Sequence, residues 1–183
     1  DDTDDGTCSP AHCSLREAIL AANGAIGSDT IRFAIDKADP GYMANGIEGT
    51  WTISLTTNLP IISADGTFID GASQAVWLGE DANKSGPEIE VSGALLGSGA
   101  CFLVTGADNV IHHLTINHCP ASGVEIRTTS ATGNTVSGSY IGVDPTGVAP
   151  WSNGISEVPS QGGTLDGYSV PASSTQVAMK SGR

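Results

Sequence analysis

Basic residues are scarce in this chain. Only 7 Lys and Arg stand against 20 Asp and Glu, which gives 183 residues a net charge of −13 at neutral pH. Binding to nucleic acid or to an anionic membrane surface depends on clustered positive charge, so both classes of partner are nearly ruled out. No apolar run approaches the about 18 to 20 residues that a bilayer-spanning helix needs. We therefore expect no nucleic-acid partner and no membrane-spanning segment.

Aromatic residues are also few, at 5%, whereas glycines number 24. This balance favours short strands and tight turns over helix bundles, and the 39% of hydrophobic residues is enough for a folded core. The length corresponds to a single domain by default. The chain opens on Asp1-Asp2 without the charged and apolar regions of a signal peptide, so we expect that any secretion signal has already been removed.

Common catalytic and nucleotide-binding signatures are missing. The sequence has no Gly-x-Ser-x-Gly elbow, no phosphate loop and no dinucleotide fingerprint. We therefore assign no catalytic residues and no cofactor, and we favour a protein that is not an enzyme.

The four cysteines are Cys8, Cys13, Cys101 and Cys119. None lies in a Cys-x-x-Cys pair or at zinc-finger spacing from a histidine, so we expect no zinc site. Three disulfide pairings are possible. We favour the short Cys8–Cys13 loop around Pro10, which leaves Cys101 for Cys119, although free cysteines buried in a core are the alternative for the second pair. Disulfides indicate an oxidising compartment outside the cytoplasm.

One helix is predicted convincingly, over residues 14–23. Its apolar residues recur at the spacing of one helical face: Leu15, Ala18, Ile19 and Ala22. Ser14 followed by Glu17 forms a capping box, and Asn23-Gly24 is a typical helix stop.

The chain after this helix consists of short alternating runs that are broken by Gly, Asn and Asp. Eight such runs predict strands, at residues 31–35, 50–55, 67–70, 88–91, 101–104, 110–116, 124–126 and 135–141. This pattern predicts an all-β architecture, either a sandwich or a solenoid.

Internal similarity favours the solenoid. Residues 108–117 align with residues 133–142 at an offset of 25, and the alignment keeps an Asn and the apolar positions. Residues 66–71 echo them, with Ile69 placed 42 residues before Ile111, which we interpret as two turns of about 21 residues. We expect a parallel β-helix whose inward residues are Ile69, Ile89, Val91, Phe102, Val104, Ile111, Leu114, Ile116, Val124, Ile126, Val136 and Ile141.

The predicted organisation has three parts. Residues 1–29 form an N-terminal cap with the helix, residues 30–149 form the β-helix coils, and residues 150–183 form an irregular C-terminal tail or arm. An end of the coil stack without a cap exposes unpaired backbone groups that another chain could extend. Residues 164–170 alternate enough to act as an added strand.

Residues 4–8 (DDGTC), 13–19 (CSLREAI) and 21–23 (AAN) carry a resemblance to a known family. This region resembles the N-terminus of CSLREA-type secreted bacterial right-handed β-helix proteins, and residues 69–71, 134–136 and 140–147 are similar to their repeat coils. The resemblance covers roughly residues 4–150. It implies a right-handed parallel β-helix solenoid with a short N-terminal capping α-helix, tied down by the flanking cysteines, in a secreted or cell-surface protein. It implies no reaction, and relatives usually continue for many more coils.

Two groups of residues could hold a metal ion. Asp1, Asp2, Asp4 and Asp5 offer oxygens for Ca²⁺, but they do not have EF-hand spacing, and a solvated acidic N-terminus is the favoured interpretation. His112, His113 and His118 lie close to Cys119, but on a coil they would point in three directions. We therefore expect surface histidines and no metal site.

Carbohydrate enzymes built on β-helices use paired carboxylates on an outer face. The candidates here are Asp70, Glu88, Glu90, Asp108, Glu125 and Asp144, with Arg127 as the one basic residue between Lys84 and Lys180. We expect these outward carboxylates to be solubility charges. Trp51, Trp77 and Trp151 could stack on sugar rings, but they are isolated in the sequence, and packing against loops is the favoured interpretation.

Two functions follow from this reading. The first is a non-catalytic secreted or cell-surface structural or adhesive module that self-associates, as a rod or filament subunit, by coil stacking or strand addition. The second is a β-helix that binds or cleaves cell-surface polysaccharide. We favour the first, and the expected partner is another copy of the chain.

Overall fold

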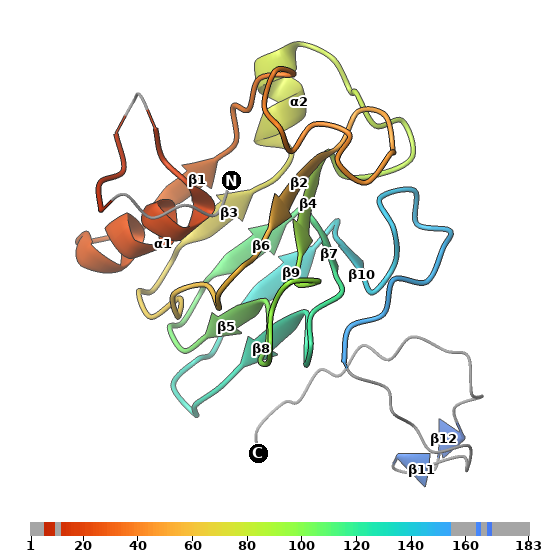
Figure 1. Ribbon diagram of the computed structural model, residues 1–183. Coiled ribbons are helices and arrows are strands. Elements are labelled where there is room, and N and C mark those ends of the chain that lie inside the picture. The colour runs from red at the N-terminus through yellow and green to blue at the C-terminus, as the bar shows by residue number, and fades with distance from the viewer. Residues whose placement is uncertain (1–5, 10–11, 155–163, 166–167, 170–183) are drawn as a thin grey trace.

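The computed structural model describes residues 6–9 and 12–154, together with two short strands at 164–165 and 168–169. Helix α1 (Leu15–Gly24) comes first, a second helix α2 (Ser73–Leu78) lies between β3 and β4, and the remaining elements are short strands. Figure 1 shows α1 beside β1 and β3, and α2 above the strands. None of the helices in the described part of the chain is both long enough and apolar enough to cross a membrane.

Three parallel sheets form the body of the molecule. The first sheet has the order β1-β3-β6-β9, with β1 (Thr30–Arg32), β3 (Phe68–Asp70), β6 (Val110–His112) and β9 (Thr135–Ser137). The second has the order β2-β4-β7-β10, with β2 (Trp51–Ser54), β4 (Ile89–Ser92), β7 (Thr115–Asn117) and β10 (Tyr140–Ile141). The third pairs β5 (Phe102–Val104) with β8 (Val124–Ile126), and Ile62 adds a parallel bridge to Val104. The separate pair β11 (Thr164–Leu165) and β12 (Tyr168–Ser169) is antiparallel.

The registers agree with the repeat in the sequence. Ile111 pairs with Val136 and Ile116 pairs with Ile141, so both pairs have the offset of 25 residues. Ile69 pairs directly with Ile111, which makes the 42-residue separation a single step from strand to strand. The interpretation of that separation as two turns of about 21 residues is wrong, because the connection at residues 71–88 is long and contains α2.

The predicted fold class needs correction. We expected an all-β closed solenoid, a right-handed parallel β-helix with one capping helix. The described residues instead form separate parallel sheets of short strands together with two helices, and no closed solenoid is detected among them. Parallel pairing was expected and is present, but the connections are too unequal for a regular coil: residues 33–50 and 71–88 are long, whereas residues 113–114 are a two-residue corner.

Helix α1 begins as the sequence predicts. The Ser14 hydroxyl accepts the Glu17 N–H, and the Glu17 carboxylate accepts the Ser14 N–H at 2.8 Å, which completes the capping box. Arg16 on the outer face donates to the carbonyls of Thr57 and Asn58 at 2.8 and 2.7 Å. Asn23 holds the next part of the same segment by donating to the Ile61 carbonyl at 2.7 Å. These contacts fix α1 against residues 57–61.

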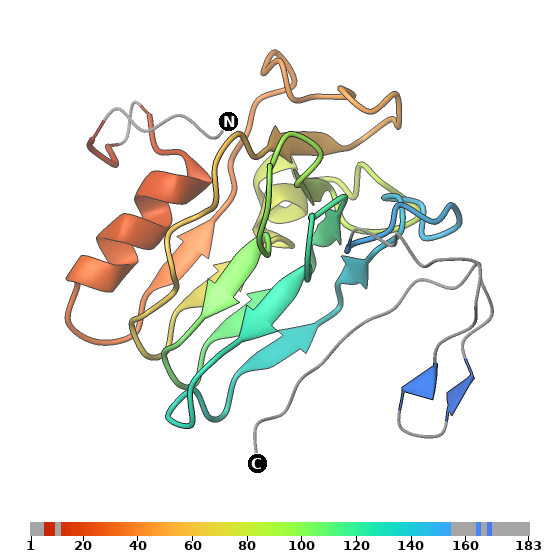
Figure 2. The same ribbon diagram turned by 60° about the horizontal axis from the view of Figure 1, so that its bottom comes forward.

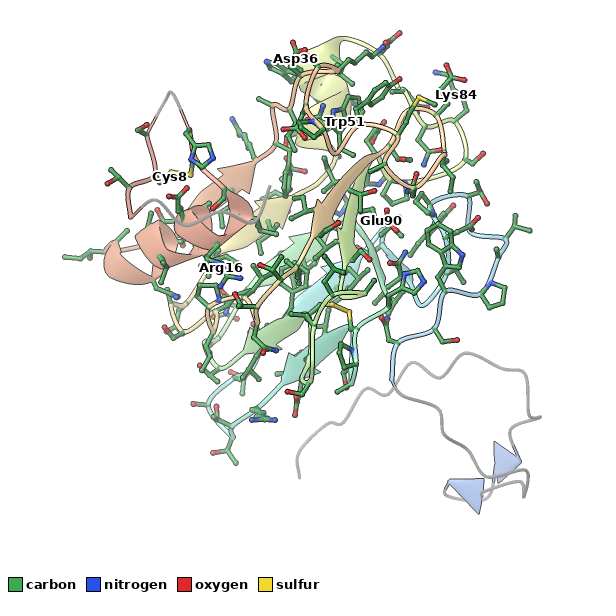
Figure 3. All side chains as sticks on the ribbon, viewed as in Figure 1. Cys8, Arg16, Asp36, Trp51, Lys84 and Glu90 are labelled. Atoms are coloured by element: carbon green, nitrogen blue, oxygen red, sulfur yellow. A yellow bond between two sulfur atoms is a disulfide. The ribbon has the colours of Figure 1, made fainter. Side chains whose placement is uncertain are left out.

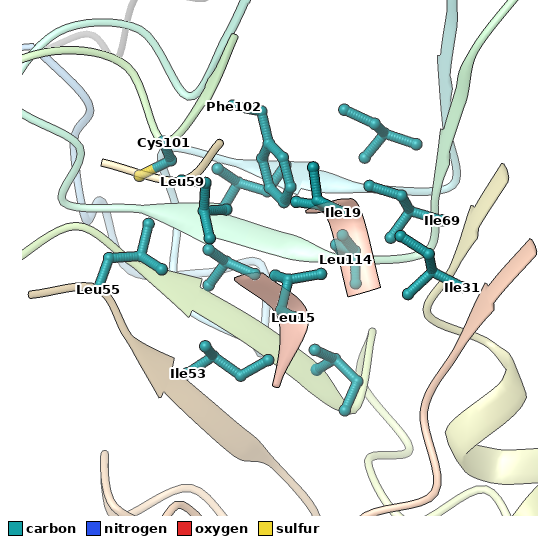
Figure 4. Packing of buried hydrophobic residues seen from close by; sticks show 14 of the residues in the cluster. Leu15, Ile19, Ile31, Ile53, Leu55, Leu59, Ile69, Cys101, Phe102 and Leu114 are labelled. Carbon is teal, nitrogen blue, oxygen red and sulfur yellow. The ribbon is translucent and has the colours of Figure 1, made fainter. Parts of the chain in front are cut away.

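The hydrophobic core lies between the sheets and α1. Leu15 and Ile19 of α1 pack with Ile31, Ile69 and Leu114, as Figure 4 shows. Of the residues predicted to point inward, those on the earlier strands are fully buried, whereas Val124, Ile126 and Val136 are partly buried at the edge of the core. The apolar pattern therefore identified the core correctly.

Helix α2 was not predicted, because six residues are too few for a helical period to show. Its first residues hold the chain that continues from β1. The Ser73 hydroxyl accepts the Phe33 N–H at 2.7 Å, and the Gln74 side chain forms a two-bond contact with the Ile35 backbone, at 2.9 Å to N–H and 2.7 Å to the carbonyl. Buried backbone groups outside the sheets are satisfied in this way.

Two disulfides are present, Cys8–Cys13 and Cys101–Cys119, and they are the pairs that the sequence favoured. The first lies just before α1. The second joins the segment before β5 to the segment after β7, and both of its cysteines are buried. No described cysteine is free.

Candidate assembly surface

The last strands of the three sheets form one end of the molecule, which we call the open end: β8, β9 and β10. Each is the terminal strand of its sheet, and no described strand pairs with its outer edge. Figure 2 shows these strands on the side of the molecule opposite α1. Unpaired strand edges offer a row of N–H and C=O groups to an added strand. The open end is thus the part of the described chain where pairing can continue.

Apolar side chains accompany these free edges. Along the inward column of the first sheet, Ile69 and Ile111 are almost completely buried, whereas Val136 at the end is only partly buried. Val124 and Ile126 on β8 are also partly buried. The open end therefore combines free backbone groups with the unfinished edge of the core, and covering it would bury further apolar area.

The opposite end is closed by α1. Leu15, Ile19 and Ala22 are buried under the helix, and Ile31 of β1 packs in the same core. The helix thus covers the apolar residues that β1 would otherwise expose. The two ends of the sheets are consequently different, because one has a lid and the other has free edges.

A repeated asparagine contact sets the register of the first sheet at the corner before each strand. Asn109 precedes β6, and its side-chain oxygen accepts the Thr67 N–H at 2.7 Å. Asn134 precedes β9, and its side-chain oxygen accepts the Asn109 N–H at 2.8 Å. The asparagine retained in the 25-residue repeat is therefore explained, because it bonds to the backbone of the preceding strand.

The candidate carboxylates do not gather into a catalytic pair. Asp70 lies on the first sheet, Asp108 at an exposed corner and Glu125 on the third sheet, where it pairs with Arg127 at 2.7 Å. Only Glu88 and Glu90, just before and on β4, come from neighbouring positions of one strand, and both are 1% exposed. The expectation that these two are outward solubility charges is therefore wrong, because loops cover the outer face of the second sheet.

Glu90 is held by three neutral donors. Asn45 and Thr52 donate to one carboxylate oxygen at 2.7 and 2.6 Å, and Asn117 donates to the other at 2.7 Å. Figure 3 shows Glu90 beside the strands of this sheet, under the surrounding loops. A buried carboxylate with this many donors is positioned as a structural acceptor, and no substrate can reach it.

Glu88 has a different environment. Its Oε2 atom is buried, has no hydrogen-bond partner among the described residues, and lies 3.7 Å from His113 Nε2. Burial raises the pKa of Glu88 above its ordinary value, although backbone N–H groups of Glu88 and Ala82 and the nearby His113 act in the opposite direction. The pair joins a half-buried histidine to a buried acid, but its acid is not open to solvent.

The histidines lie in three separate environments, as expected. His112 contacts the Ser137 hydroxyl at 3.1 Å, His113 faces Glu88, and His118 contacts the Asn117 side-chain oxygen at 3.0 Å. His113 has a φ of 54° at the corner where the repeat has Gly138, which has a φ of 62°. No cluster of three or more metal-ligating His, Cys, Asp or Glu occurs within the residues that the structure describes. The candidates Asp1, Asp2, Asp4 and Asp5 lie outside those residues.

Asp144 belongs to a turn. Burial disfavours its charged form, but hydrogen bonds from the Thr146 hydroxyl and from the Ala149 and Val148 N–H groups outweigh that effect and lower the pKa of Asp144. The carboxylate therefore stabilises the loop after β10.

The three tryptophans are also apart. Trp51 is buried and donates to the Asp36 carbonyl at 3.0 Å, whereas Trp77 on α2 is half exposed. Trp151 packs on His118 with ring centres 5.1 Å apart. A hollow of about 310 Å³ opens beside His118, lined mainly by small residues such as Gly93, Ala94 and Gly97.

Comparison of the chain with family models, with curated proteins and with solved structures gave no match. The site must therefore be judged from its own geometry. Sequence reasoning found the free strands and the conserved spacing of the repeat, but it missed the burial of Glu88 and Glu90. The residues around them, Glu-Ile-Glu-Val, alternate as an exposed strand would, and nothing local in the sequence shows that distant loops cover them.

Proposed function

We propose that this protein is a non-catalytic structural or adhesive module, secreted or displayed on a cell surface, that self-associates through its open end. The observation that carries the proposal is the coincidence of three free strand edges with partly buried apolar residues at β8, β9 and β10. Addition of strands at such an edge supplies backbone hydrogen bonds and burial of apolar area together. The scattered candidate carboxylates support the absence of a reaction.

The geometry favours pairs over a continuous filament. Growth of a filament requires each copy to bind at two ends, and α1 covers the end at β1. Two copies that meet through their open ends form a symmetric, closed contact with no further site for addition. Among the assemblies expected from the sequence, we therefore propose a dimer as the basic unit.

The extracellular location rests on two supports. The chain carries two disulfides, which persist in oxidising compartments. The resemblance of residues 4–150 to CSLREA-type proteins supports the same location. The strong negative charge is consistent with a well-solvated surface.

Sedimentation velocity over a range of protein and salt concentrations tests the proposal. We expect a concentration-dependent dimer that becomes tighter as salt rises, because salt screens the repulsion between two copies of charge −13. Val136→Lys places a charge on the open end and should abolish the dimer, whereas Val76→Lys, at an exposed site on α2, should not. A wild-type protein that stays monomeric at every concentration and salt level overturns the proposal, even if Val136→Lys fails to fold.

Polysaccharide binding is the second candidate. The hollow beside His118 and the ring of Trp151 favour it, because aromatic faces and small residues accommodate sugar rings. A screen of neutral and acidic glycans with wild type and Trp151→Ala tests it. Binding that is lost in the variant supports this function, and equal signals from both proteins count against it.

A further inference from the structure

The asparagine contact at the first sheet is a two-bond clamp. Asn109 accepts the Thr67 N–H with its side chain, and Val110, the next residue, donates its N–H to the Thr67 carbonyl at 2.9 Å. Asn134 and Thr135 repeat this on Asn109, with distances of 2.8 Å for both bonds. An Asn-X dipeptide thus satisfies both backbone groups of one residue on the strand before it.

The same clamp occurs at another corner. Asn153 accepts the Cys119 N–H with its side-chain oxygen at 2.9 Å, and Gly154 donates its N–H to the Cys119 carbonyl at 2.7 Å. The arrangement therefore does not depend on the particular residues of the first sheet. It is a recurring way in which this chain adds one segment to the edge of another.

A neighbouring position shows that asparagine is required. Thr67 occupies the place of Asn109 one strand earlier, where Phe68 donates to the Asp29 carbonyl at 2.8 Å. The Thr67 hydroxyl is buried and has no partner among the described residues, so it makes no side-chain bond of the clamp. A threonine side chain is too short, and the amide oxygen of asparagine reaches the backbone N–H that the hydroxyl does not.

The last member of the series is Asn134. Its side chain is engaged, because Oδ1 accepts from Asn109 and Nδ2 donates to the Gly106 carbonyl at 2.9 Å. Its own backbone N–H and carbonyl have no partner among the described residues, and they are the groups that the clamp engages at Thr67 and Asn109. Val136 follows two residues later, with its partly buried side chain in the column of Ile69 and Ile111.

We propose that the open end binds a parallel strand of sequence Asn-X-Val or Asn-X-Ile that is supplied by a separate polypeptide. The Asn side chain accepts the Asn134 N–H, the N–H of X donates to the Asn134 carbonyl, and the β-branched residue packs on Val136. This inference uses the same surface as the proposed function and adds a sequence preference to it.

Residues 1–183 offer no suitable donor of their own. The eight asparagines all precede residue 154, and none occurs in residues 155–183. Asn109, Asn134 and Asn153 already form clamps, and the other five are engaged elsewhere, for example Asn117 with Glu90. A second folded copy of this chain therefore covers the open end without filling the clamp, which leaves a strand from another polypeptide as the specific occupant.

The chain itself provides the probe. A synthetic peptide with the sequence of residues 131–142, acetylated and amidated, contains Asn134-Thr135-Val136 in the spacing that already docks on Asn109. Its controls are the same peptide with Asn134→Ala and with Val136→Lys. Binding to the full ¹⁵N-labelled protein is followed by titration of backbone amide shifts.

We expect the unchanged peptide to shift the amides of Asn134 and of β9, and the Asn134→Ala peptide to bind about 10-fold more weakly through loss of one hydrogen bond. The Val136→Lys peptide should not bind. Absence of binding by the unchanged peptide, or equal affinity of the Asn134→Ala peptide, overturns the inference.

The outcome is separate from that of the proposed function. A dimer that forms while the peptide does not bind sustains self-association and refutes the sequence preference. A monomer that binds the peptide does the reverse. If both hold, the peptide should dissociate the dimer, because the two compete for β9.

Discussion

The amide of Asn117 on β7 donates to a carboxylate oxygen of Glu90 on β4 at 2.7 Å, and both side chains are buried. The second Glu90 oxygen accepts from Asn45 and Thr52. Glu90 thus connects two strands of the second sheet to the loop at residue 45. A carboxylate is suited to this place because it can accept from all three donors at once.

Glu90→Gln should destabilise the protein by about 3 kcal/mol, because the new amide group places donors against donors and leaves buried groups unsatisfied. Urea unfolding followed by circular dichroism measures the change. Glu125→Gln is the control, since that side chain forms a surface pair with Arg127 and its loss should cost less than about 1 kcal/mol. Equal losses in the two variants would contradict the structural role of Glu90.

Glu88 should give the stability a dependence on pH. Because its pKa is raised in the folded protein, the native state binds the proton more tightly than the unfolded state. The charged carboxyl therefore destabilises the fold at neutral pH, and this penalty disappears as pH falls through the folded pKa towards the ordinary value of 4.5. Glu88→Gln removes the titration.

The melting temperatures of wild type and Glu88→Gln, measured from pH 8 to pH 4.5, test this sign. The difference between them should move in favour of wild type as the pH falls. The exposed Glu80 is the control with the opposite direction, because Lys37 lowers the pKa of Glu80 and that contribution is lost on acidification. A difference between wild type and Glu88→Gln that does not change with pH would refute the assignment.

The two disulfides should contribute unequally. Cys101 and Cys119 are 18 residues apart and Cys8 and Cys13 are 5 apart, so chain entropy assigns about 3 kcal/mol to the first and about 2 kcal/mol to the second. Urea unfolding of the two double Cys→Ala variants measures both. A greater loss from the Cys8–Cys13 variant would show that chain entropy does not govern these bonds.

Loosening α1 should change the assembly. Arg16→Ala removes the two bonds to the Thr57 and Asn58 carbonyls, and Ser14→Ala removes the helix cap, at about 1 kcal/mol for the cap. If α1 is what prevents addition at β1, the double variant should form species larger than dimers. Sedimentation at high protein concentration detects them, and Leu20→Ala, an exposed residue of the same helix, is the control. A double variant that stops at dimers would show that α1 does not limit growth.

The predictions from the sequence succeeded where local patterns act alone. The Ser14–Glu17 capping box, the apolar face of α1 and the 25-residue pairing register all follow from short-range rules, and all are present. The role of Asn134 follows from the same repeat, since the alignment keeps an asparagine at Asn109 and Asn134.

The failures concern contacts between distant segments. The burial of Glu88 and Glu90 depends on covering loops, one of which brings Asn45 to Glu90, and no periodicity within β4 reveals it. Helix α2 is too short to have a period, and its insertion makes the step from Ile69 to Ile111 one connection of unequal length. The same irregular connections overturned the closed solenoid.

Amide hydrogen exchange measured as a function of protein concentration tests the open end most directly. Pairing through β8, β9 and β10 predicts that the amides of residues 124–126, 135–137 and 140–141 become more protected as concentration rises, while those of α1 and β1 do not change. Protection that is independent of concentration at these strands, or that rises at α1 and β1 instead, would contradict the account.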